Sequence, residues 1–167
     1  MVNSSPTTSS ESNTSKSSEH NIMASTLADN KAIVEQFLEG IDNHDLSVFD
    51  EYLSDDHTTG IYRSGTGEGI EGREGMKDLW QEYWEAFPDL AGESTELIAE
   101  DDRVAIFRKE TGTHEGTWRG IEPTGNEITF EYAGYVVVND GQVVHSHFLG
   151  NILDLVRQLG VEPPIPR

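Results

Sequence analysis

The 167-residue sequence contains no cysteine and no run of eighteen apolar residues. Without cysteine the chain forms no disulfide, performs no thiolate chemistry and builds no cysteine-based zinc site, so the redox state of its compartment is unconstrained. A transmembrane helix needs about 20 predominantly apolar residues in succession, and no stretch of the chain provides them. These missing features exclude a disulfide-stapled domain, a cysteine enzyme and a helical membrane protein.

Basic residues are also scarce. Eleven Lys and Arg, of which four are Lys, stand against 31 Asp and Glu, and the formal net charge is -20. Such a surface repels nucleic acid and anionic lipid, so neither is an expected partner. The acidic, lysine-poor composition is similar to that of proteins from halophilic organisms, whose surface carboxylates hold water and ions. No basic segment followed by an apolar core opens the chain, so we expect a cytoplasmic protein rather than a secreted one.

One domain is expected, flanked by two tails. Residues 1–26 are rich in Ser, Thr, Asn and Glu with little apolar content, which predicts a disordered tail. Met23 is itself a sensible start, so the sequence leaves open whether translation begins at Met1 or Met23. The 35% hydrophobic content suits a single packed domain over residues 27–162, with 163–167 as a C-terminal tail.

Helical patterns occupy the first half of this domain. Apolar residues recur at helical spacing over about 27–41, 45–53 and 72–87, and Pro88 ends the third stretch. Between the second and third stretches, residues 54–72 contain five glycines. We interpret this segment as a long loop, of the kind that forms a pocket rim or a mobile cover.

Strand patterns occupy the second half, where the apolar period changes to two. The predicted strands span 93–100, 103–116, 126–138 and 142–150. The last two flank Asn139-Asp140-Gly141, a strong signal for a two-residue hairpin turn. Helices grouped before hairpin-linked strands indicate an α+β fold, with three helices packed on one face of an antiparallel sheet. A strongly curved sheet of this kind leaves a cone-shaped cavity between itself and a long helix.

The final stretch from Asp140 to Gly160 combines a polar strand with a helix. Alternation places Val143, His145, His147 and Leu149 on one strand face, with Asn151 next on the same side. The short C-terminal helix that follows carries an apolar stripe and is stopped by Gly160. A polar strand face held down by a helix predicts one wall of a pocket.

Seven short segments between Leu27 and Gly160 stand in an order and spacing typical of one protein family. They are GIEGREG at 69–75, AFPDL at 86–90, LIAEDDRVA at 97–105, TGTHEG at 111–116, GIEPTG at 120–125, DGQVV at 140–144 and LVRQLG at 155–160. In this pattern the chain resembles the SnoaL-like polyketide cyclases (ester cyclases) of the nuclear-transport-factor-2-like superfamily. The resemblance implies a cone-shaped α+β barrel, a homodimer formed through the sheet, a pocket and no cofactor.

The resemblance also implies a reaction and positions for its residues. Characterised members close rings by intramolecular aldol condensation of polyketide esters, with an aspartate near the end of the last strand as acid/base. That position is Asn151 here, and the family's Trp-Asp pair slightly earlier falls on His147-Phe148. The Asn-His pair that often follows the second helix falls on Thr59-Gly60, with His57 two residues before it. The superfamily also includes isomerases, hydrolases, dehydratases and non-catalytic binders.

Histidines are the remaining candidates for acid–base chemistry. His147 is the proposed catalytic base because imidazole titrates near neutrality, and the plainer alternative is a histidine on a solvated strand. Asn151 and His114 are candidate hydrogen-bond donors to an enolate oxygen. His114 has an alternative structural role, in which it binds the backbone of its turn. His145 shares the strand face with His147, and this pair is only half of a metal site, so we expect no metal.

Further residues are candidates for binding a small-molecule substrate. Glu131 and Tyr132 point to opposite faces of their strand, so one of them faces inward. A Glu inside an apolar cone has a raised pKa and serves as a base, whereas a surface position is the plainer interpretation. The substrate-binding candidates are His57, Tyr62, Trp80, Trp118, Tyr132 and His145, although ordinary packing explains the aromatic ones equally well.

These observations support two hypotheses about function. The first is a cofactor-independent enzyme acting on a small carbonyl or ester compound by proton transfer and enolate stabilisation. The second is a non-catalytic small-molecule-binding or dimerisation domain of the same fold that has lost the catalytic aspartate. Water addition, as in epoxide hydrolases of this superfamily, requires an inward Asp-Arg-Asp set that the sequence does not reveal. The sequence does not identify the substrate.

Overall fold

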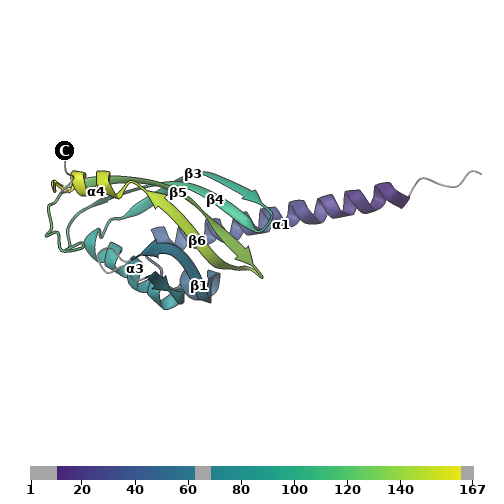
Figure 1. Cartoon of the computed structure of the whole chain (residues 1–167), viewed down its shortest axis with the longest axis horizontal. Helices are drawn as coiled ribbons and strands as arrows, with labels where there is room; N and C mark the ends of the chain where they lie inside the picture. Colours follow the sequence, from purple (N-terminus) through teal and green to yellow (C-terminus); the bar gives the residue numbers. More distant parts are fainter. Residues whose placement is uncertain (1–10, 63–68, 163–167) are drawn as a thin grey trace, which may run out of the picture.

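The computed structural model describes residues 11–62 and 69–162, with side chains for residues 26–60 and 70–162. Its elements are α1 (Glu11–Asp42), α2 (Ser47–Tyr52), β1 (Leu53–Tyr62), β2 (Gly69–Glu71), α3 (Gly72–Ala86), β3 (Ala91–Glu100), β4 (Arg103–Thr113), β5 (Glu127–Asn139), β6 (Gln142–Gly150) and α4 (Ile152–Gln158). The predicted α+β class is confirmed. Figure 1 shows α1 and α3 on the same side of a curved sheet, with α4 at one end of it.

The sheet has six strands in the order β2-β1-β6-β5-β4-β3. All neighbouring strands are antiparallel except β1 and β6, which run parallel. The expected purely antiparallel sheet is therefore corrected to a mixed one. The prediction of a long loop over residues 54–72 is wrong, because β1 and β2 lie within that range. The part of this loop at residues 63–68 lies outside the described residues. The polar sequence of β1 lacks an apolar alternation, and its partner β6 lies far along the chain, so no local pattern revealed the strand.

Helix α1 begins at Glu11, earlier than the start predicted near Leu27, and its first half extends beyond the sheet in Figure 1. Residues 11–26, expected as part of a disordered tail, are helical in the structure. Neither Pro nor Gly occurs between Glu11 and Glu39, so nothing in that stretch breaks a helix. Within the described residues no helix is long and apolar enough to cross a membrane.

Two apolar clusters fill the space between the helices and the inner face of the sheet. The larger joins α1, α2 and α3 to the strands, through side chains such as Phe37, Phe49 and Ile106. The smaller lies where α3 ends, and it packs Phe87 and Trp118 against Leu155 and Leu159 of the α4 segment. Burying aromatic side chains stabilises this arrangement by about 1.5–3 kcal/mol each.

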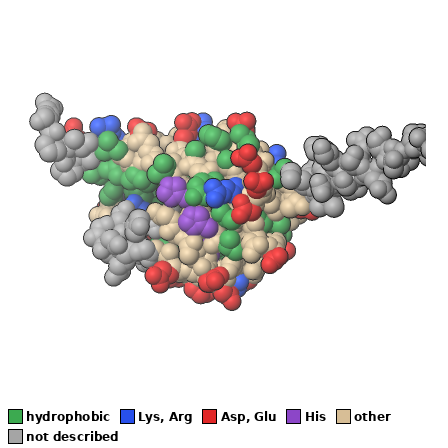
Figure 2. Space-filling view, turned by 45° about the vertical axis from the view of Figure 1, so that its right-hand side comes forward, with side chains coloured by type: hydrophobic (Ala, Val, Ile, Leu, Met, Phe, Trp, Pro, Cys, Tyr) green, Lys and Arg blue, Asp and Glu red, His purple; other side chains and the backbone are tan. Residues whose placement is uncertain are grey.

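The outer face of the sheet carries two short apolar rows. Phe107, Ala133 and Leu149 are register partners across β4, β5 and β6. The next row pairs Ala105 with Tyr135 and begins at the half-exposed Ile98 of β3. Figure 2 shows histidine side chains in the middle of one face, beside hydrophobic and Lys or Arg side chains, with most acidic side chains towards the edges.

Candidate functional site

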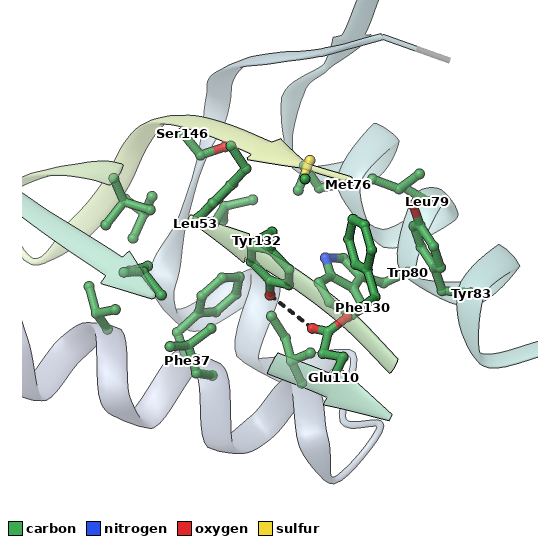
Figure 3. A pocket seen from close by; sticks show the side chains of 18 of the residues that line it. Phe37, Leu53, Met76, Leu79, Trp80, Tyr83, Glu110, Phe130, Tyr132 and Ser146 are labelled. Atoms are coloured by element: carbon green, nitrogen blue, oxygen red, sulfur yellow. Dashed lines mark hydrogen bonds between the residues drawn. The ribbon is translucent and has the colours of Figure 1, made fainter. Parts of the chain in front are cut away.

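A cavity of about 220 Å³ lies between the inner face of the sheet and helices α1 and α3 (Figure 3). Its walls are mostly apolar and aromatic, and its polar lining side chains come from β1, α3, β4, the segment after β4, β5 and β6. The lining residues are Val34, Phe37, Leu38, Ile41, Leu53, His57, Met76, Leu79, Trp80, Tyr83, Ile106, Glu110, Arg119, Phe130, Tyr132, Val136, Val143, Ser146, Phe148, Gly150 and Ile152. A concave apolar pocket with a few polar groups is the usual form of a small-molecule site.

Glu110 is the carboxylic acid of this cavity. It lies on β4 in phase with the buried Val104 and Ile106, and only 6% of it is exposed. The Tyr132 hydroxyl on β5 donates a hydrogen bond to Oε1 of Glu110 at 2.8 Å (Figure 3). Burial raises the pKa of Glu110 above its ordinary value, although hydrogen bonds from Tyr132 and Arg108 oppose the shift. Burial also raises the pKa of Tyr132, so its hydroxyl stays protonated and remains a donor.

Glu110 also contacts a buried cation, Arg108. Arg108 is two residues before Glu110 on the same strand face, and its Nε donates to Oε1 of Glu110 at 3.3 Å. Its Nη1 donates to the Ser94 hydroxyl at 3.2 Å, and its Nη2 donates to the carboxylate of Asp42 at the end of α1. Asp42 also accepts the backbone N–H of Gly92 at 2.9 Å. The network Asp42–Arg108–Glu110 fixes the orientation of the Glu110 carboxyl through two side chains that do not line the cavity.

A second phenol, Tyr83, and a guanidinium, Arg119, also line the cavity. Tyr83 comes from α3, and burial raises the pKa of its hydroxyl. The positive charge of Arg119 opposes this shift and the charge of Glu110 adds to it, so the three groups are near one another. Arg119 also covers the ring of Trp118, with its guanidinium carbon 4.6 Å from the ring centre. This end of the cavity therefore combines an acid, a phenolic donor and a cation.

His57 is the predicted site residue that lies deepest in the cavity wall. It comes from β1, only 1% of it is exposed, and neither ring nitrogen has a hydrogen-bond partner among the described residues. Burial, followed by the charge of His145, lowers its pKa to about 4. Trp80 and Tyr132, two more predicted substrate-binding residues, also line the cavity.

The predicted face of β6 is interrupted by an extra residue. Val138 of β5 pairs with Val143, but the preceding Val137 pairs with His145, so Val144 has no partner. An unpaired residue of this kind is a β-bulge, and it reverses which side chains point inward beyond it. The prediction that Val143 shares a face with His145 is therefore wrong.

Beyond the bulge, Ser146 and Phe148 point into the cavity and the histidines point away from it. His145 binds the Thr58 hydroxyl through Nδ1 at 2.8 Å, and its ring lies 5.9 Å from that of Tyr135. The ring of His147 lies 6.0 Å from the same tyrosine. Both predicted site residues therefore lie on the outer face of the sheet. No group of three His, Asp or Glu side chains suited to a metal ion occurs among the described residues.

The other two predicted catalytic residues also lie outside the cavity lining. Asn151 is exposed and caps α4, where its Oδ1 accepts the backbone N–H of Asp154 at 3.1 Å. His114 is fully buried, and its Nδ1 accepts the backbone N–H of Thr124 at 3.2 Å. This contact corresponds to the structural alternative, in which His114 fastens its own turn. Burial lowers the pKa of His114, so its imidazole is neutral at neutral pH.

Two aromatic candidates remain. Trp118 is buried against Tyr83 and Phe87 rather than exposed to the cavity. Tyr62 ends β1, and its side chain lies outside the described residues. The structure thus brings His57, Trp80 and Tyr132 together around one cavity.

Sequence reasoning missed Glu110, Arg108, Tyr83 and Arg119. A signal for the first two was present, because Arg108 and Glu110 continue the inward alternation of Val104 and Ile106 along β4. The prediction that either Glu131 or Tyr132 faces inward resolves to Tyr132, since Glu131 is exposed.

The family model of SnoaL-like polyketide cyclases matches residues 31–159. Among solved structures, AclR from Streptomyces galilaeus, described as "a putative hydroxylase", is 29% identical, with 84% of this chain and 91% of that chain covered and a TM-score of 0.71. A "putative SnoaL-like polyketide cyclase" from Jannaschia sp. CCS1 is 20% identical, covering 81% and 94% with a TM-score of 0.72. IdmH from Streptomyces antibioticus, "a putative polyketide cyclase", is 24% identical, covering 79% and 99% with a TM-score of 0.68. No curated protein sequence matches the chain.

The fold of these neighbours is the nuclear-transport-factor-2-like fold described above. The family model spans most of the domain, from the middle of α1 through α4. The chain therefore belongs to the SnoaL-like polyketide cyclase family.

Proposed function

We propose that this protein is an enzyme that transfers a proton at the carbon next to a carbonyl or ester group of a small compound, with Glu110 as the base. The observation that carries the proposal is a carboxyl with a raised pKa, buried in an apolar cavity and oriented by Tyr132 and Arg108. An apolar site strengthens a carboxylate as a base because it withholds the water that would stabilise the charge. Proton transfer of this kind needs no electron carrier, so the proposal invokes no cofactor.

The proposed step breaks a carbon–hydrogen bond and leaves its electron pair on the substrate as an enolate. The proton moves to the carboxylate of Glu110. The Tyr83 hydroxyl donates a hydrogen bond to the enolate oxygen, and the charge of Arg119 stabilises the negative charge that develops there. The enolate then regains a proton at another position, or its carbon attacks a second carbonyl of the same molecule and closes a ring.

A non-catalytic binding domain is the second candidate function. The observation that favours it is Asn151, which stands at the position of the family's acid/base, faces solvent and caps α4. In that case the cavity binds a small molecule without turning it over.

Water addition is less well supported by the geometry. Asp42, Arg108 and Glu110 form an acid–arginine–acid set. Only Glu110 lines the cavity, however, and Asp42 accepts its hydrogen bonds outside the cavity wall. A second carboxylate is thus missing from the place where a water and an epoxide would meet, which favours proton transfer at carbon.

The experiment uses 2-tetralone, a bicyclic aromatic ketone, and follows exchange of its α-protons in D₂O by NMR. We expect the full-length protein to exchange these protons faster than buffer alone. The Glu110→Gln variant should lose at least about 100-fold of that acceleration, because this is the usual contribution of a general base. Glu131→Gln is the matched control, because it makes the same change on the exposed face of the neighbouring strand. Exchange that persists in Glu110→Gln contradicts the proposal, and binding without any exchange supports the non-catalytic alternative.

We also propose that a second copy of the chain covers the outer face of the sheet. Three large side chains of the apolar rows on that face are exposed: Ile98 by 50%, Phe107 by 42% and Leu149 by 73%. Exposed apolar rows on a sheet face are suited to an identical partner, since a two-fold contact buries the same rows on both copies.

A further inference from the structure

His57 is a buried polar side chain that the proposed proton transfer does not use. Only 1% of His57 is exposed, yet neither of its ring nitrogens has a hydrogen-bond partner among the described residues. Buried polar groups are nearly always hydrogen-bonded, and one that is not costs about 1–3 kcal/mol. Among the described residues, two other side chains carry a buried nitrogen without a partner, Trp84 and His114. Of the three, only His57 lines the cavity.

The imidazole of His57 is neutral at physiological pH. Burial, followed by the positive charge of His145 on the adjacent strand, lowers its pKa to about 4. A neutral imidazole carries one N–H donor and one acceptor nitrogen. No described protein group fixes which nitrogen holds the proton, so either tautomer is available to a ligand.

His57 and Glu110 lie on different parts of the cavity wall. In the strand order, β1 is separated from β4 by β6 and β5, so the two residues are three strand spacings apart across the sheet, ~14 Å. The pairing registers also place His57 near the level of Arg103, seven residues before Glu110, so the two are displaced along the strands as well. Phe148 and Val136, on the intervening strands, line the cavity between them with apolar surface. A molecule that reaches both residues must therefore be elongated and apolar in its middle.

We propose that His57 binds a neutral hydroxyl or carbonyl group at one end of an elongated apolar ligand whose other end reaches Glu110. The proposal rests on the proposed function for the role of Glu110, but the binding step at His57 does not require turnover. It assigns the cavity to uncharged compounds with two separated oxygen functions, built on a flat or aromatic framework that suits the aromatic walls.

The distribution of charge in the cavity determines which group belongs at the His57 end. Among the described lining residues, only Glu110 and Arg119 are charged, and both act on Tyr83 at the opposite end. Near His57 the polar neighbour is Ser146, whose hydroxyl donates to the Thr59 hydroxyl at 3.1 Å. A carboxylate or ammonium at this end would be buried without a counter-charge, whereas a hydroxyl or carbonyl is satisfied by the imidazole.

The test compares 2-naphthol with naphthalene as probes of the full-length protein. We expect the ¹⁵N imidazole signals of His57 to shift on saturation with 2-naphthol and to shift much less with naphthalene. His114 is the internal control, since it is equally buried, has a nitrogen without a described partner and lies outside the cavity lining. In His57→Phe, which keeps an aromatic ring of similar size, the preference for 2-naphthol over naphthalene should fall roughly three- to tenfold.

Two results overturn the proposal. One is a His57 signal that 2-naphthol leaves unchanged, and the other is an undiminished preference for 2-naphthol in a folded His57→Phe variant. The NMR measurement on the unmodified chain decides the question if that variant fails to fold. Glu110→Gln separates this proposal from the proposed function. We expect that variant to lose proton exchange and to keep the naphthol-dependent shift of His57.

Discussion

The Tyr132 hydroxyl and the Glu110 carboxylate face one another across β4 and β5, 2.8 Å apart inside the cavity. Burial keeps the phenol protonated, so the bond runs from Tyr132 to the carboxylate. Because this hydrogen bond stabilises the charged form of Glu110, it opposes the rise in pKa that burial produces. The proton affinity of the proposed base is therefore set by two opposing effects, and each can be changed by a single substitution.

Replacing Tyr132 by Phe removes the donor and leaves the ring in place. We expect the pKa of Glu110 to rise further, so the acid limb of the pH profile for 2-tetralone exchange moves to higher pH. The free energy of unfolding should fall by about 1 kcal/mol, the usual net contribution of one hydrogen bond. The measurement is the exchange rate between pH 4 and 9, and an unmoved acid limb contradicts the assignment of Glu110.

Replacing Asp42 by Asn should move the same profile in the opposite direction. The negative charge of Asp42 raises the pKa of Glu110, so its removal lowers that pKa and shifts the acid limb to lower pH. Loss of the charged partner of Arg108 should also reduce the free energy of unfolding by about 1–2 kcal/mol. Asp29→Asn is the control, because it removes the same charge from an exposed position of α1. Equal effects of the two variants would show that only net charge matters.

His57 should make the protein sensitive to mild acid. Its pKa is 6.5 when unfolded and about 4 when folded, so the unfolded chain binds the extra proton between these values. Stability is unaffected by this group above pH 6.5 and falls as the pH drops towards 4, by up to about 3 kcal/mol. In His57→Phe the loss of stability over this range should be smaller. Denaturant unfolding at several pH values measures the difference, and identical slopes for both proteins contradict it.

Leu149 should control self-association through the outer face of the sheet. Leu149→Asp places a charge among the apolar rows and should weaken the proposed homodimer at least roughly tenfold without unfolding the chain. Higher salt should strengthen the wild-type dimer, because it screens two chains of net charge -20. Light scattering with size-exclusion chromatography measures both effects. A wild-type chain that is monomeric at every salt concentration excludes the homodimer.

Much of the fold was predictable because its signals are local. The Asn139-Asp140-Gly141 turn lies as expected between β5 and β6, with positive φ angles of 49° at Asp140 and 81° at Gly141. The helical spacing of α3 and the stop at Pro88 also predicted that element closely. By contrast, β1 pairs in parallel with a strand far along the chain, and such a pairing leaves no mark in its own polar sequence.

The candidate site was less predictable because a single residue decides which side chains face inward. Val143 and Val144 are both apolar, so the sequence does not say which of them is the extra residue of the bulge. Pairing with β5 settles the choice, and it turns His145 and His147 to the outer face. On β4 no bulge intervenes, and the alternation from Val104 to Glu110 was a usable signal of an inward acid.

A titration of the Glu110 carboxyl in the full-length protein tests most directly whether Glu110 is the base. Its ¹³C signal, assigned by its loss in Glu110→Gln, should titrate with a midpoint above the ordinary value of 4.5. We expect this midpoint to coincide with the acid limb of 2-tetralone exchange. A carboxyl that titrates at or below the ordinary value, or an exchange profile that follows another group, would contradict Glu110 as the base.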